Sequence, residues 1–187
     1  QYVGMGKDYY DQLDSAKERY LTASEILEFN LEEISFSGPE DKLRKTKFTQ
    51  PAIFVHSIIV NDLLKAKEIN PDAVAGHSLG EFSALVSAEV LTFEDALRIL
   101  KVRSIEMENA GKIVPGAMAA IIGADKKELE IICRQNGIVV PANINAPRQA
   151  VISGDKIAVE AAINTAKKIG IRRALPLRVS GAFHSPL

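Results

Sequence analysis

The sequence has one cysteine, three histidines and a nearly balanced charge, and each of these shortages excludes a class of protein. The single cysteine, Cys133, cannot form a disulfide within the chain and suits a reducing compartment. Histidine and cysteine do not recur at metal-ligand spacing, so we expect no metal ion and no bound cofactor. A net charge of −1 gives no reason to expect nucleic acid as a partner.

Long apolar runs are also missing. No stretch reaches the ~18 apolar residues needed to cross a bilayer, and no signal peptide opens the chain. We therefore expect a cytoplasmic protein with no membrane partner. The chain has 187 residues, of which 47% are hydrophobic and 25% charged, so it can bury a core as one domain or as one domain with a subdomain.

The most informative stretch is Gly-His-Ser-Leu-Gly at residues 76–80, which has the Gly-x-Ser-x-Gly pattern of a nucleophile elbow. In that motif a serine lies on a sharp turn between a strand and a helix. The short apolar run Pro71–Ala75 predicts a buried strand of a parallel sheet. The segment Glu81–Ala88 contains no helix breaker and predicts the helix.

The residue types in this turn suit a nucleophile elbow for physical reasons. Gly76 and Gly80 lack a Cβ, which allows the turn to close tightly. Ser78 would lie at the helix N-terminus, where the dipole favours negative charge. The N–H of Leu79 could then be one oxyanion donor. The alternative is a glycine-rich turn that only links a strand to a helix.

Helical patterns surround the turn. Apolar residues at spacings of three and four predict helix from Lys7 to about Glu33, and Ser37–Glu40 marks a break. A second helix is predicted to begin near Thr49, with Pro51 in its first turn, and to run to Leu64. His56 lies within that helix and is interpreted as a packing residue.

A third predicted helix, from Thr92 to about Ala110, carries an arginine on its apolar side. Arg103 falls within the arc formed by Ile99, Ala96, Met107, Leu100, Phe93 and Leu97, whereas Arg98 and Lys101 lie on the opposite side. An unpaired buried charge is very costly, so Arg103 either pairs with an internal carboxylate or faces a cavity that takes an anionic ligand. Its planar fork suits a carboxylate held by two hydrogen bonds.

From Gly116 onward the elements follow the order β-α-β-β-α-β, which is typical of a ferredoxin-like subdomain. The predicted ranges are strand 116–123, helix 125–136, strands 138–145 and 149–153, helix 155–169 and strand 171–179. Cys133 is expected to pack inward from the first of these helices. The predicted organisation is a large subdomain over 1–114, a small one over 115–180, and a return to the large subdomain over 181–187.

The last residues contain a candidate base. His184 lies just beyond the final predicted strand in a loop of glycine, serine and proline, where a catalytic histidine could act on Ser78. A surface histidine is the alternative. Asn143 and Asn145 fall at the end of a predicted strand and could border a cleft.

Several segments together resemble one family, the malonyl-CoA:acyl carrier protein transacylases of bacterial type II fatty acid synthesis. They are Gly-His-Ser-Leu-Gly-Glu at 76–81, Thr-Gln-Pro-Ala at 49–52, Gly-Ala-Met-Ala-Ala-Ile-Ile-Gly at 116–123, Arg-Ala-Leu-Pro-Leu at 173–177 and Gly-Ala-Phe-His-Ser at 181–185. The resemblance spans the chain. It implies an α/β fold in which an α/β-hydrolase-like large subdomain carries an inserted ferredoxin-like small one.

The resemblance also implies roles for particular residues. Ser78 would be the nucleophile, His184 the base, Leu79 an oxyanion donor through its N–H, and Arg103 the partner of the malonyl carboxylate. The other residues that it implies at the substrate are His77, Gln50, Met107, Phe183 and Asn145. Compared with the family, the sequence would lack a glutamine before Gln1 that supplies the second oxyanion donor, and a C-terminal segment.

The expected substrates are malonyl-CoA and phosphopantetheinylated acyl carrier protein, and the expected state is a monomer. A basic cluster before His184 could attract either substrate, or it could be a solvated helix end; it consists of Lys167, Lys168, Arg172, Arg173 and Arg178. The alternatives are a serine hydrolase of esters or thioesters, the acyltransferase domain of a polyketide synthase, and a fragment that only binds its ligands.

Overall fold

The computed structural model describes residues 1–177, 179 and 181–187. The chain divides into two compact units, unit 1 over Gln1–Ile105 and unit 2 over Glu106–Leu187. The boundary falls within one long helix, α7 (Phe93–Ile113). Arg178 and Ser180 lie outside the described residues, and with them one member of the predicted basic cluster and the predicted end of the small subdomain.

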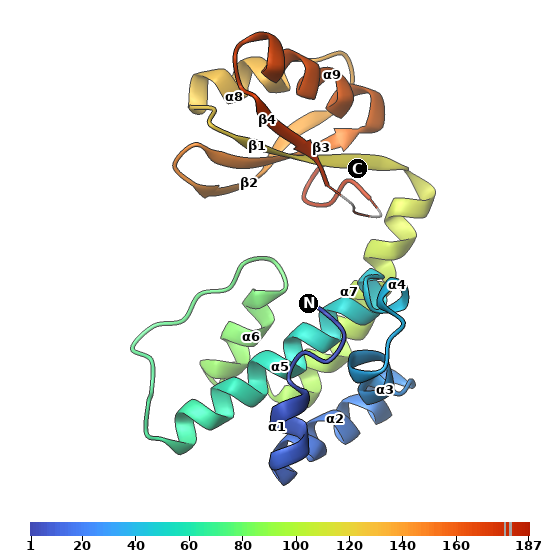
Figure 1. The fold of residues 1–187 in the computed structure, drawn as a ribbon, viewed down its shortest axis with the longest axis vertical. Coiled ribbons are helices and arrows are strands. Elements are labelled where there is room, and N and C mark those ends of the chain that lie inside the picture. The colour runs from blue at the N-terminus through green and yellow to red at the C-terminus, as the bar shows by residue number, and fades with distance from the viewer. Residues whose placement is uncertain (178, 180) are drawn as a thin grey trace. The chain divides into compact units, whose positions relative to one another are not determined.

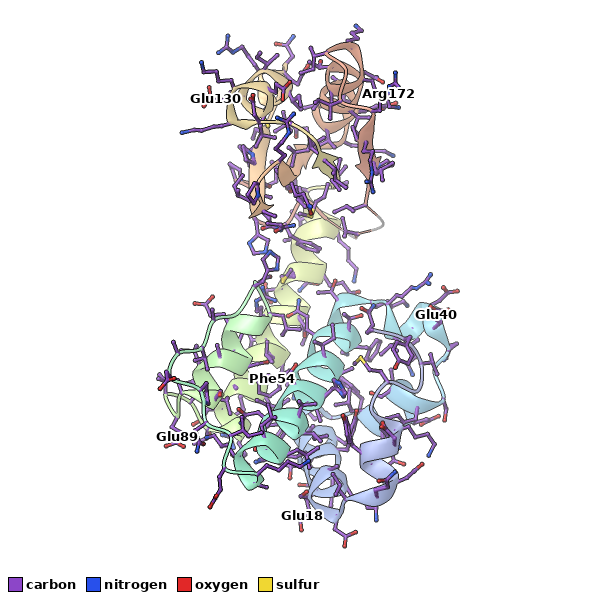
Figure 2. The ribbon with its side chains drawn as sticks, turned by 60° about the vertical axis from the view of Figure 1, so that its left-hand side comes forward. Glu18, Glu40, Phe54, Glu89, Glu130 and Arg172 are labelled. Atoms are coloured by element: carbon purple, nitrogen blue, oxygen red, sulfur yellow. The ribbon has the colours of Figure 1, made fainter. Side chains whose placement is uncertain are left out.

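Unit 1 is helical. Its helices are α1 (Lys7–Gln12), α2 (Asp14–Leu27), α3 (Leu31–Phe36), α4 (Glu40–Leu43), α5 (Thr46–Ala66), α6 (Gly80–Ser87) and the first part of α7 (Figure 1). The core lies between α2, α3, α5 and α7, because these helices direct their apolar faces toward one another. Phe54 of α5 is fully buried there, stacked 5.6 Å from Phe93, whereas Glu18, Glu40 and Glu89 point outward (Figure 2).

The predicted helical segment Lys7–Glu33 is interrupted twice. Leu13 has an extended backbone, with φ −124° and ψ 119°, and separates α1 from α2. Glu28 adopts a left-handed conformation with φ 61° and ends α2. Asn30 then caps α3, since its side chain accepts from the N–H of Glu33. Apolar periodicity located the helical residues, but it did not show where the direction of the chain changes.

Two predictions about the longer helices need correction. Helix α5 begins at Thr46 rather than near Thr49, so Pro51 lies inside the helix and is buried instead of occupying the first turn. Ile99, which the helical arc placed inward, is 42% exposed. The rest of the predicted arc is correct at Phe93, Ala96, Leu97 and Leu100, which are all buried. The cap is also confirmed, because Thr92 Oγ1 accepts from the Asp95 N–H at 3.0 Å.

The predicted strand Pro71–Ala75 is wrong for this structure. These residues are irregular and exposed. A strand needs a neighbouring strand to accept and donate its backbone hydrogen bonds. None of residues 1–105, all of which the structure describes, forms a strand. Without such a neighbour, the apolar run stays in the connection between α5 and α6 (Figure 1).

Unit 2 confirms the predicted order of elements. It contains β1 (Gly116–Ile122), α8 (Lys126–Cys133), β2 (Val139–Ala146), β3 (Gln149–Asp155), α9 (Lys156–Lys168) and β4 (Arg173–Pro176). The strands form an antiparallel sheet in the order β2-β3-β1-β4. Both helices lie on the same side of this sheet (Figure 1), and their apolar faces build the second core with the strands.

A local signal marks the start of α8, as the sequence predicts. Asp125 and Glu128 form a complete capping box at the start of α8. The observed β4 is shorter than the predicted strand 171–179. Its paired residues are Arg173–Pro176, and the N–H of Leu177 also donates to the carbonyl of Met118 in β1 at 2.9 Å. Glu130 and Arg172 lie on the outside of unit 2 (Figure 2).

Cys133 packs against the core of unit 2 at the end of α8, as predicted. Burial raises the pKa of its thiol to about 11. No helix among the described residues is both long and apolar enough to span a membrane.

The raised pKa of Cys133 should make the folded protein resistant to alkylation. At pH 8 we expect iodoacetamide to react about 100-fold more slowly with the native protein than with the urea-unfolded chain, because a shift of two pKa units lowers the thiolate fraction by that factor. Intact mass against time measures both rates. Equal rates would contradict the burial of this thiol.

Candidate active site

The residues around Ser78 form a sharp turn that leads into helix α6, as the sequence predicts, although the predicted strand before the turn is not formed. Ser78 has a positive φ of 53°, a conformation that a residue with a side chain rarely adopts. The N–H of Gly80 donates to the carbonyl of His77 at 2.9 Å, and the N–H of Glu81 donates to the carbonyl of Ser78 at 3.3 Å. Backbone strain of this kind collects at functional sites, where the surrounding structure maintains it.

Gly76 is the residue that lets the turn close. A Cβ at Gly76 would lie 1.9 Å from the carbonyl carbon of Gly80 and 2.0 Å from its oxygen. A Cβ at Gly80 would meet nothing within 4 Å. The prediction that both glycines permit a close approach is therefore confirmed for Gly76, whereas Gly80 has room for a side chain here.

Ser78 immediately precedes the first turn of α6. Leu79 is the N-cap residue of this helix and packs partly against the core of unit 1. The first backbone N–H groups of a helix have no intrahelical acceptors, and the helix dipole adds partial positive charge at the same end. The N–H of Leu79 belongs to this end of the helix, and its role as an oxyanion donor stays a prediction.

Arg103 reaches Ser78 from α7. Its Nη2 donates to Ser78 Oγ at 2.9 Å, and its Nη1 donates to Oε1 of Gln50. Both acceptors are neutral. Among the described residues, Arg103 therefore forms no ion pair with the internal carboxylate that one of the two interpretations required. It places the half-buried cation directly beside the serine hydroxyl.

The surroundings of Arg103 are partly apolar. The ring of Phe82, on α6, lies 5.6 Å from the guanidinium, within the range of a cation–π contact. Burial lowers the pKa of Arg103, and the negative charge of Glu81 opposes this shift. Burial weakens the hydration of the cation, so that a carboxylate ligand would be a better partner here than at the surface.

Gln50 is the second hydrogen-bond partner of Arg103. It lies on α5 and is only 5% exposed, which is unusual for a glutamine. Because Gln50 Oε1 accepts from Arg103, its polar group is used within the protein. The sequence predicts Gln50 at the substrate, and in the structure Gln50 contacts Arg103, the predicted partner of the substrate carboxylate.

The other predicted site residues divide between the two units. His77 is exposed in the same turn as Ser78. Met107, Asn145, Phe183 and His184 belong to unit 2. Asn145 is exposed at a register shift between β2 and β3, and Met107 is half-buried on α7. Their roles at a substrate stay predictions.

His184 lies in a short turn after the sheet of unit 2. It is exposed and has a positive φ of 56°. The turn is tied by Ser185, whose Oγ donates to the carbonyl of Ala182 at 2.7 Å. Gly116 approaches Ala182 closely, since a Cβ at Gly116 would lie 2.4 Å from the Ala182 Cβ. These contacts hold the turn against the start of β1 in unit 2.

Sequence reasoning missed Phe82. The residue follows Ser78 by four positions at the start of α6, so its side chain can lie over the turn that holds the serine. That spacing was visible in the sequence. What the spacing could not show is that α7 brings Arg103 to the same place.

A cavity next to the turn is separate from the serine and the arginine. It has a volume of about 600 Å³ and is lined by α5 residues such as Ser57 and Asn61 and by residues 74–77, but not by Ser78 or Arg103. Among the described residues, histidine, cysteine and acidic side chains form no group of three or more that could hold a metal ion.

Comparison with known proteins gives consistent matches. The sequence matches the model of the acyl transferase domain family over residues 1–187. It is 42% identical over 191 aligned residues to the malonyl CoA-acyl carrier protein transacylase of Staphylococcus aureus, and 44% identical to that of Bacillus subtilis. The alignments include 100% of this chain but 61% and 60% of these relatives, so the chain spans about three fifths of their length.

A solved structure is similar throughout. It is a malonyl-transacylase in complex with the acyl carrier protein of a type II polyketide synthase, 40% identical to this chain with a TM-score of 0.91. The match covers 97% of this chain and 60% of that one.

The two glycines of the turn provide a matched pair of variants. We expect Gly76→Ala to lower the free energy of unfolding by about 2–4 kcal/mol, because the added methyl group would overlap the backbone of Gly80. Gly80→Ala should change it by about 1 kcal/mol or less, since space is available there. Urea denaturation of both variants measures the difference, and equal effects would contradict the close approach at Gly76.

Proposed function

Because the chain belongs to the acyl transferase domain family, we propose that the protein transfers malonyl from malonyl-CoA to the phosphopantetheine thiol of acyl carrier protein. The reaction would proceed through a malonyl-serine ester at Ser78. The observation that carries this proposal is the position of Arg103, whose guanidinium lies 2.9 Å from Ser78 Oγ. A nucleophile beside a half-buried cation suits an acyl group that ends in a carboxylate.

In the proposed first half-reaction, Ser78 Oγ attacks the thioester carbonyl and His184 accepts its proton. The N–H of Leu79 stabilises the oxyanion, and CoA leaves as its thiol with the proton from His184. The strained turn presents the serine, and the N-terminus of α6 favours the developing negative charge.

In the second half-reaction the thiol of the carrier protein attacks the malonyl-serine ester. His184 accepts the thiol proton, and Ser78 leaves with a proton returned from the histidine. Each half-reaction exchanges one acyl bond for another, which gives ping-pong kinetics and needs no metal or redox cofactor.

Arg103 would select the acyl group. A malonyl carboxylate can accept two hydrogen bonds from the guanidinium, and Gln50 and Phe82 hold the arginine in place. A neutral acetyl group has no carboxylate for Arg103. Binding of acetyl would leave the cation without a charged acceptor, and acetyl-CoA should therefore be a poorer substrate.

The wider organisation is also part of the proposal. Unit 1 would belong to an α/β-hydrolase-like subdomain, which the serine turn supports, and unit 2 would be its ferredoxin-like insert, which the order β-α-β-β-α-β supports. Acyl carrier protein as the partner is supported by the relative solved in complex with one. A cytoplasmic location and a monomeric state stay predictions.

A second candidate differs only in the acceptor. The relative in that complex serves a type II polyketide synthase, so the carrier protein could belong to polyketide rather than fatty acid synthesis. The serine hydrolase alternative is less well supported, because a hydrolase of neutral esters has no use for a cation beside its nucleophile.

Covalent loading of Ser78 is the direct test. After the full-length protein is mixed with malonyl-CoA, we expect intact mass to show one malonyl adduct, which phosphopantetheinylated acyl carrier protein then removes. Ser78→Ala should give no adduct and lose transfer activity by on the order of 10⁴-fold or more. Ser83→Ala, which removes a neighbouring serine of α6, is the control and should load normally.

Steady release of CoA into water with no adduct and no transfer would favour the hydrolase instead. Comparison of carrier proteins from fatty acid and polyketide synthesis as acceptors separates the two transferase candidates.

Two variants of α7, Arg103→Ala and Arg98→Ala, test whether Arg103 makes the protein prefer malonyl-CoA over acetyl-CoA. Arg103→Ala should lower kcat/KM for malonyl-CoA by roughly 100-fold, from the loss of charge-assisted hydrogen bonds worth about 3 kcal/mol, and should narrow the preference over acetyl-CoA. Arg98→Ala removes an exposed arginine paired with Asp95 and should leave both substrates unaffected. Unchanged selectivity in Arg103→Ala would refute the proposed role.

A further inference from the structure

We propose that Arg103 also restrains the nucleophile, and that the carboxylate of the acyl group releases this restraint. Arg103 donates a hydrogen bond to Ser78 Oγ at 2.9 Å. The same guanidinium is the expected partner of the substrate carboxylate. One side chain would therefore sense the acyl group and control the reactivity of the serine that attacks it. The inference rests on the proposed function only for the identity of the carboxylate.

The guanidinium is held from three sides. Gln50 accepts from Nη1, Ser78 accepts from Nη2, and Cζ lies over the ring of Phe82, 5.6 Å from its centroid. Gln50 and Phe82 belong to α5 and α6, and both are at least partly buried. Of the three contacts, that with the half-buried serine hydroxyl is the one an incoming ligand can replace.

The contact should lower the reactivity of Ser78. A serine hydroxyl attacks with a lone pair of Oγ, and it has two such pairs. A hydrogen bond from a cation occupies one pair and withdraws electron density from the oxygen. During attack, the oxygen gives up further density, so this hydrogen bond weakens. The ground state is thus stabilised more than the transition state, which raises the barrier.

A carboxylate should displace the hydroxyl from Arg103. A carboxylate carries a full negative charge and can accept two parallel hydrogen bonds from the guanidinium fork, which makes it a stronger partner for the cation than one neutral oxygen. Ser78 offers one neutral oxygen. Because Gln50 and Phe82 keep the guanidinium near its position, a malonyl carboxylate that reaches the fork would take over the contact with Nη2 and free Ser78 Oγ.

The consequence is discrimination in the chemical step. A neutral acyl group would bind more weakly and would also meet a serine that still accepts from Arg103. A malonyl group would gain both a charged partner and a more reactive nucleophile. This mechanism adds to selectivity without a further contact to the substrate.

The test uses a neutral reagent that does not compete for the arginine. Phenylmethanesulfonyl fluoride forms a bond between Ser78 Oγ and sulfur, fluoride leaves, and the hydroxyl proton passes to the general base. Intact mass of the full-length protein against time gives the labelling rate, and Ser78→Ala shows that the label is on this serine. Formate, a small carboxylate that fits the fork without filling an acyl site, is added against sodium chloride at equal ionic strength.

We expect formate to raise the labelling rate of the unmodified protein about tenfold and chloride to leave it unchanged. Arg103→Met, which keeps an unbranched side chain but has no hydrogen-bond donor, should label at the fast rate with or without formate. Arg98→Met on the exposed side of α7 should behave as the unmodified protein.

Two results would overturn the inference. One is a labelling rate that does not respond to formate in the unmodified protein, an outcome that does not depend on any variant folding. The other is an Arg103→Met protein that labels no faster than the unmodified one. Labelling is measured without malonyl-CoA, so a failure here is distinct from a failure of malonyl transfer.

Discussion

The backbone of residue 76 passes so close to that of residue 80 that no side chain fits between them. This approach closes the turn, and the closed turn imposes the left-handed conformation of Ser78. The serine is thereby placed at the N-terminus of α6 with its hydroxyl toward α7. The position of Ser78 at the N-terminus of α6 and its contact with Arg103 both depend on this one steric constraint.

The second requirement is electrostatic. A half-buried guanidinium must be stabilised by hydrogen bonds or by a charged partner. In unit 1 its contacts are the amide of Gln50 on α5, the hydroxyl of Ser78 in the turn and the ring of Phe82 on α6, and no carboxylate of the described residues forms an ion pair with it. This set of contacts is the basis of the proposal that an anionic ligand exchanges with Ser78 at Arg103.

Local patterns predicted the elements that local interactions stabilise. The turn at Ser78, the helix after it, the caps at Thr92 and Asp125 and the six elements of unit 2 all have short-range signals in the chain. The strand at 71–75 was mispredicted, because apolar character favours a strand only where another strand lies beside it. The breaks at Leu13 and Glu28 and the exposure of Ile99 depend on how helices pack, which periodicity does not encode.

The sequence by itself determined the chemistry: a serine in a glycine-bounded turn, an arginine on the apolar side of a helix and a histidine in a terminal loop. The tertiary structure decided which of these groups meet. It brought Gln50, Ser78, Phe82 and Arg103 together from separate elements and gave Arg103 neutral partners. Residue type and spacing fix what a side chain can do within its own helix or turn. Contacts between residues far apart in the chain follow only from the packing of whole elements.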